Sequence, residues 1–186
     1  MPHLTASKGE MNMKNRTLRQ ITAAGVIAAA YAALSLVLAS TTFGPVQCRV
    51  SEALTLLPVI SPAAIWGVTL GCAVTNGVGA ATGTNFLGLV DLPVGTAATL
   101  LAAVATRLLG KIRFGGVPWL SALPPILFNA VAIGAEWCYA ATGSINVAFW
   151  AFAGQIALGQ LPPCLLGVWL IHLLERRGLQ NIIEGK

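Results

Sequence analysis

The residues best suited to chemistry lie in a short polar segment between apolar stretches. It reads Phe43-Gly-Pro-Val-Gln-Cys-Arg-Val-Ser-Glu52 and combines amide, guanidinium, hydroxyl and carboxyl groups. We predict that Gln47, Arg49 and Glu52 belong to a ligand-binding site, because charged groups make the strongest hydrogen bonds to a ligand. The alternative is structural, with Arg49 and Glu52 forming a pair that closes the segment onto the rest of the protein.

Further candidates lie within or beside apolar stretches. An ionisable group in a membrane span is costly and usually faces the bundle interior or a cavity, which favours a site at Asp91 and Glu136. Trp137 would cover a flat ligand or belong to the interfacial aromatic belt. Amide side chains complete the predicted site, and the deeper ones have the alternative role of tying helices together. These amides are Asn76, Asn129 and Gln155.

The composition indicates a polytopic membrane protein. The 186 residues are 56% hydrophobic and only 9% charged, with a mean hydropathy of +0.77. Soluble domains carry about 25% charged residues, so this chain has too little polar surface to cover a soluble globule. The net charge of +5 is explained by the rule that keeps Lys and Arg on the cytoplasmic side.

Hydropathy predicts an all-α bundle of six transmembrane helices. The predicted spans are 18–39, 51–60, 62–80, 90–109, 121–141 and 146–174, within a membrane domain 18–177 flanked by cytoplasmic tails 1–17 and 178–186. The second is the weakest, since ten residues of α-helix extend only about 15 Å. Pro162-Pro163 predicts a kink in the last helix.

The basic residues predict the orientation. With six crossings, ten of the eleven Lys and Arg residues fall on one side, and Arg49 is the exception. Both termini are therefore expected in the cytoplasm. Five crossings would put one basic cluster outside, so this asymmetry also supports 51–60 as a crossing.

Small residues recur at a spacing of four in two predicted helices. Ala24, Ala28 and Ala32 form a smooth stripe, which we predict to be a docking face for a partner subunit, with internal packing as the alternative. Gly67, Gly71, Thr75 and Gly79 form a similar stripe, for which internal packing is the expected role.

The sequence gives no sign of catalytic machinery. It contains no G-x-x-x-x-G-K-[ST] phosphate loop, no H-E-x-x-H and no serine nucleophile elbow. The four cysteines are scattered, which argues against a metal or redox site. We therefore expect no cofactor, no metal and no ATPase activity of the chain's own. Uphill transport would draw its energy from a gradient or another protein.

The polar segment and its flanks resemble a known family. Residues 28–35 and 43–57, together with 88–92, 129–136 and 157–160, are similar to the QueT family, the substrate-binding S components of energy-coupling factor (ECF) transporters. The resemblance is collinear over residues 14–177.

This resemblance implies a multi-pass S component of a prokaryotic cell membrane, with both termini cytoplasmic. It implies a transmembrane scaffold subunit and two ATPases as partners, docking through the helix 1 alanines. It also implies uptake of a queuosine precursor, a 7-deazaguanine such as queuine or its aminomethyl relative. Such a ring offers N–H donors to a carboxylate and an acceptor to an amide or Arg.

Three alternatives stay open at this point. The first is an S component for another flat, vitamin-like molecule, which would have the same architecture. The second is an integral membrane enzyme, which would need a nucleophile or metal cluster in its spans. The third is a purely structural bundle, which would leave Asp91 and Glu136 unexplained.

Overall fold

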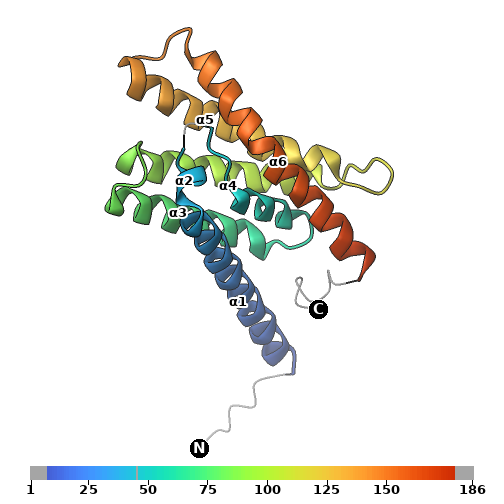
Figure 1. Cartoon of the computed structure of the whole chain (residues 1–186). Coiled ribbons are helices and arrows are strands. Elements are labelled where there is room, and N and C mark those ends of the chain that lie inside the picture. Colours follow the sequence, from blue (N-terminus) through green and yellow to red (C-terminus); the bar gives the residue numbers. More distant parts are fainter. Residues whose placement is uncertain (1–7, 45, 179–186) are drawn as a thin grey trace, which may run out of the picture.

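The computed structural model describes residues 8–44 and 46–178, with side chains from Asn15 onward. The described chain is helical, with no strand among its elements. In chain order the elements are α1 (Lys8–Val37), α2 (Ala39–Thr42), η1 (Val50–Val59), α3 (Ala63–Thr82), η2 (Gly88–Val90), α4 (Asp91–Leu109), η3 (Trp119–Ala122), α5 (Leu123–Thr142) and α6 (Phe149–Arg176). Figure 1 shows their arrangement.

Five segments of the described chain are long and apolar enough to cross a membrane. They are Asn15–Val37, Ala63–Thr82, Gly88–Leu109, Trp119–Thr142 and Phe149–Arg176. The all-helical fold class is thereby confirmed. One boundary differs clearly from the prediction: α1 begins at Lys8 rather than at residue 18. Hydropathy does not detect this first part because its residues are polar, although Lys, Glu, Met and Arg all favour helix.

The element at 50–59 is a 3₁₀-helix, so our assumption of an α-helical rise was wrong. A 3₁₀-helix rises about 2.0 Å per residue, so ten residues extend about 20 Å instead of about 15 Å. η1 packs against α1, α3, α4 and α6, and most of its residues are buried. It lies inside the bundle, and because its winding is tighter, its ten residues extend further along the helix axis than an α-helix of the same length would.

Contacts at glycines show that α1 and α3 run in the same direction. A Cβ on Gly67 would lie 3.0 Å from the carbonyl oxygen of Ala24, and one on Gly71 would lie 2.9 Å from that of Ala28. Contacts at this distance require residues without side chains, so the helices pack backbone to backbone. The predicted internal role of the α3 stripe is confirmed at these two positions.

η1 connects α1 to α3 in the chain and runs back along the bundle, so that these two helices can be parallel. At its start, the hydroxyls of Ser35 on α1 and Ser51 on η1 share a hydrogen bond of 2.6 Å. At its other end, Arg107 near the end of α4 donates to the carbonyl oxygen of Pro58 at 2.9 Å. α4 then runs antiparallel to α3, and the α5–α6 hairpin packs against α4 through α5.

The described basic side chains gather at one end of the bundle. One end of the bundle is formed by the starts of α1, α3 and α5 and by the ends of η1, α4 and α6, and we call it the basic end. The opposite end, with the α3–α4 and α5–α6 connections, is called the polar end (Figure 1). The described basic side chains at the basic end are Arg16, Arg19, Arg107, Lys111, Arg113, Arg176 and Arg177. Arg49 lies at the polar end.

Candidate functional site

The segment after α2 crosses the polar end and lies directly on α6. A Cβ on Gly159 of α6 would overlap the carbonyl oxygen of Val46, so only glycine allows this contact. Next to it, the Gln160 amide donates to the carbonyl oxygen of Gln47 at 3.1 Å. Gln47 has a φ of 46° and is only 2% exposed. Residues other than glycine rarely adopt this left-handed backbone conformation, so the surrounding contacts must hold Gln47 in it.

Arg49 ties the same segment to α4 through a buried ion pair. Its Nη2 lies 3.2 Å from Oδ2 of Asp91, and the two side chains are 3% and 0% exposed. Its Nε also donates to the carbonyl oxygen of Thr42 at 3.3 Å. Burial alone would lower the pKa of the Arg49 guanidinium, but the charge of Asp91 helps to raise it above its ordinary value. Arg49 therefore keeps its positive charge.

The alternative pairing of Arg49 with Glu52 is not formed in the described structure, where Arg49 pairs with Asp91. Glu52 lies in the first turn of η1 and faces α1, where its carboxylate accepts a hydrogen bond of 2.6 Å from the Tyr31 hydroxyl. The side chain of Asn129 on α5 hydrogen-bonds to the same carboxylate. Sequence reasoning missed Tyr31, although it lies in a segment that carries the family resemblance. Glu52 and Asn129 are thus brought together, joining α1, η1 and α5.

Asp91 is the centre of a second network at the start of α4. Its Oδ2 accepts from Asn85 at 2.7 Å as well as from Arg49, and its backbone carbonyl accepts from Asn76 at 2.9 Å. A Cβ on Gly95, one turn along α4, would collide with the side chains of both Asp91 and Asn76. Gly95 therefore leaves the space in which these two side chains meet.

Glu136 and Trp137 approach the polar end from α5. The Trp137 ring stacks on Phe86, with ring centroids 5.1 Å apart, and its centroid lies 6.5 Å from that of Phe152. Leu87, Ile133 and Ile156 form the small hydrophobic cluster beside it. The predicted aromatic cover of a flat ligand thus has two further rings that sequence reasoning did not single out. In the sequence, Phe86 is an ordinary loop residue and Phe152 an ordinary apolar residue of a helix, so neither residue indicated a role in binding.

Several buried polar atoms of these residues have no hydrogen-bond partner in the described structure. They are Nε2 of Gln47, Oδ1 of Asn76, Oδ1 of Asp91, Oγ1 of Thr96, both carboxylate oxygens of Glu136, Nε1 of Trp137 and Oε1 of Gln160. Buried polar atoms in proteins nearly always have a partner, because leaving one unsatisfied costs about 1–3 kcal/mol. Such a concentration at one end of a bundle is typical of a binding site.

The predicted site residues therefore divide into two groups. Arg49 and Glu52 use their charged groups to hold the fold together, and Asn129 hydrogen-bonds to Glu52. A second set keeps free polar atoms, namely Gln47, Asn76, Asp91, Glu136 and Trp137. Gln155 is half-buried on α6 and does not join the hydrogen-bond network of the described residues.

Comparison with protein families now assigns the chain. A family model described as QueT transporter matches residues 21–176, which is most of the sequence. The chain belongs to the QueT transporter family. No curated protein and no solved structure was found to match it.

Membership of the QueT family agrees with the fold and the site. It indicates a membrane S component of a transporter, which acts with partners on a small-molecule substrate, rather than an enzyme. The apolar helices make this QueT family member a multi-pass membrane protein.

Proposed function

We propose that this chain is the substrate-binding subunit of an ECF-type importer and captures a queuosine precursor from outside the cell. The observation that carries the proposal is the set of buried polar atoms without partners at the polar end. A structural bundle would satisfy these atoms internally, whereas a binding subunit leaves them for its substrate. The substrate would be a 7-deazaguanine such as queuine or its aminomethyl relative.

The recognition chemistry follows from the free atoms and the rings. A 7-deazaguanine presents N–H donors at N1 and the 2-amino group, which match the free oxygens of Asp91, Asn76 and Gln160. Its O6 acceptor matches a free N–H such as that of Gln47 or Trp137. The stacked rings of Phe86 and Trp137 supply an aromatic face for the planar heterocycle.

We further propose that the basic end faces the cytoplasm and the polar end faces outward. The distribution of the described basic side chains supports this orientation. η1 then acts as the sixth crossing, since it returns the chain from the polar end to the basic end between two parallel helices. Both termini would lie inside the cell, in a prokaryotic plasma membrane.

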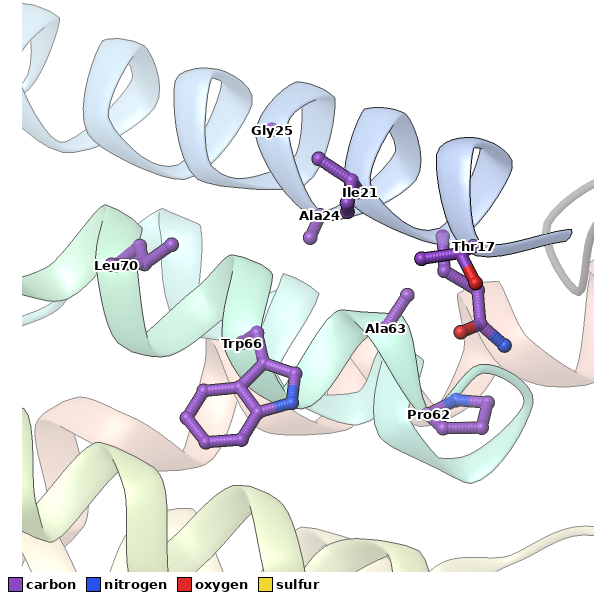
Figure 2. A pocket seen from close by; sticks show the side chains of 9 residues that line it. Thr17, Ile21, Ala24, Gly25, Pro62, Ala63, Trp66 and Leu70 are labelled. Carbon is purple, nitrogen blue, oxygen red and sulfur yellow. The ribbon is translucent and has the colours of Figure 1, made fainter. Parts of the chain in front are cut away.

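The exposed side of α1 is proposed as the face that docks on the scaffold subunit. Ala32 is buried, Ala24 and Ala28 are half-buried beside α3, and the small residues next to this stripe are exposed. An apolar groove of about 540 Å³ lies between α1 and α3, and its lining includes Ala24 and the exposed Trp66 (Figure 2). A smooth helix face beside an apolar groove suits close packing of another helix in lipid.

Two measurements test the proposed function. Native mass spectrometry of the purified subunit should retain 7-aminomethyl-7-deazaguanine from a mixture of vitamins and nucleobases. Cellular uptake of the same compound should require co-expression of the scaffold and both ATPases. Retention of a different compound would assign another substrate, and uptake without the ATPases would overturn the ECF assignment.

A further inference from the structure

The connection between α4 and η3 forms a tight hairpin at the basic end. Phe114 and Val117 form an antiparallel bridge, in which each backbone N–H donates to the other's carbonyl oxygen, at 3.1 and 3.2 Å. The two residues between them, Gly115 and Gly116, have φ values of 61° and 80°. Two-residue turns with positive φ at both positions close β-hairpins, and glycine adopts this conformation without strain. The two glycines therefore fix a hairpin, which projects from the bundle (Figure 1).

An ion pair fastens this hairpin to the end of α6. Arg113 donates from Nη1 and Nη2 to the two carboxylate oxygens of Glu175, at 2.6 and 2.7 Å. Its Nη1 also donates to the carbonyl oxygen of Gly116 at 3.2 Å. A bidentate pair of this kind fixes direction as well as distance. One side chain thus joins both arms of the hairpin to α6, and the hairpin has a defined position on the bundle.

The hairpin and the start of η3 expose large apolar side chains. Ile112, Phe114 and Trp119 are between 45% and 59% exposed. The same connection contributes another residue, Val117, to the packing against the core. Single exposed apolar residues are ordinary on protein surfaces, but three within eight residues of a fixed connection indicate a surface that something covers.

The place of these residues in the chain selects a lipid surface as that cover. The candidate spans on either side end at Leu109 and begin at Trp119. Every residue of the connection therefore lies within five positions of a span, at the boundary between membrane and water. Aromatic side chains anchor proteins at this boundary, where their rings sit at the level of the lipid head groups.

The charges beside the hairpin fit anionic head groups. Lys111, Arg176 and Arg177 are exposed. The acid next to them, Glu175, is already paired with Arg113. The remaining charge of this described surface is therefore positive. A basic side chain close to an anionic membrane surface strengthens binding to it by about fivefold.

We propose that the hairpin is a membrane-surface anchor, which inserts Ile112, Phe114 and Trp119 among lipid head groups. Lys111 and the basic residues at the end of α6 select anionic lipids for this contact. The anchor is independent of the substrate and applies to whichever leaflet meets the basic end. Because Arg113 ties the hairpin to α6, the anchor sets the depth of α4, α5 and α6 in the bilayer together.

Fluorescence quenching of the full-length subunit in lipid bilayers tests the anchor at its tip. Phe114→Trp introduces an indole there, and its signal is the difference from the wild-type protein. Phosphatidylcholine brominated on its acyl chains close to the head group should quench this indole strongly, whereas aqueous acrylamide should quench it weakly. Unbrominated phosphatidylglycerol should relieve the quenching about fivefold more effectively than unbrominated phosphatidylcholine.

Two further variants locate the preference. Lys111→Gln, combined with Phe114→Trp, removes one charge and should bring the preference for phosphatidylglycerol below about twofold. Leu158→Trp is the matched control, because it places an indole on an exposed position within the α6 span. Brominated lipid should quench this indole as well, but with no preference between the two lipids.

Three results would overturn the anchor. Quenching of the indole at position 114 by acrylamide but not by brominated lipid would place the hairpin in water. Protection from both quenchers would mean that a second copy of the chain covers it. Quenching by lipid without a preference for phosphatidylglycerol, or with a preference that Lys111→Gln leaves unchanged, would overturn the selection of anionic lipid through Lys111.

Discussion

The ion pair between Arg49 and Asp91 gives the sharpest test of the structure, because a second ion pair in the same chain serves as its control. The first pair is 3% and 0% exposed, while Arg113 and Glu175 form a bidentate pair that is 33% and 19% exposed. Arg49→Met should destabilise the protein by about 3–5 kcal/mol, since it leaves the Asp91 carboxylate buried without its cation. Arg113→Met should cost at most about 1 kcal/mol, since water screens an exposed pair.

Unfolding in mixed micelles by titration with a denaturing detergent would measure both changes, with tryptophan fluorescence as the signal. The double variant Arg49→Met with Asp91→Leu should recover much of the loss, because it removes the buried charge that the single variant strands. Equal effects of Arg49→Met and Arg113→Met would refute the assignment of Arg49 to a buried site. A double variant no better than Arg49→Met would show that Asp91 is not its partner.

Three further predictions concern the connection, the docking face and the orientation. Gly159→Ala should displace the segment at Val46 and abolish substrate binding measured by calorimetry. The control is Gly154→Ala, where an added Cβ meets nothing within 4 Å, so this variant should bind substrate normally and gain up to about 1 kcal/mol in stability. If both variants bound substrate with wild-type affinity, the contact between Gly159 and Val46 would be contradicted. Ala29→Trp, on the exposed side of α1, should keep substrate affinity but lose co-purification with the scaffold and uptake, while Leu158→Trp on an exposed face of α6 should do little; full uptake by Ala29→Trp would remove α1 from the interface. Cys48, which is half-buried at the polar end, should react with a membrane-impermeant thiol reagent in intact, substrate-free cells, and labelling only after lysis would reverse the proposed orientation.

Much of the site was accessible from the sequence because charge in an apolar chain is informative by itself. A carboxyl group in a span must face the interior, which singled out Asp91 and Glu136 without any knowledge of the fold. The same argument found Arg49, the one described basic side chain at the polar end. It did not find Phe86 or Phe152, because an aromatic residue in a membrane protein is ordinary and only its position beside Trp137 gives it a role.

Hydropathy and small-residue spacing determined the helical class, the five long apolar segments and the internal packing of α3, because each depends on residues close together in the chain. Only the tertiary structure decided which polar groups meet. Arg49 pairs with Asp91 rather than Glu52, and Tyr31 takes the Glu52 carboxylate, since helix orientation and the 3₁₀ winding of η1 set these distances. The tertiary structure also separated the polar atoms that the fold satisfies from those of Glu136 that it leaves free, because satisfaction depends on every neighbour in space.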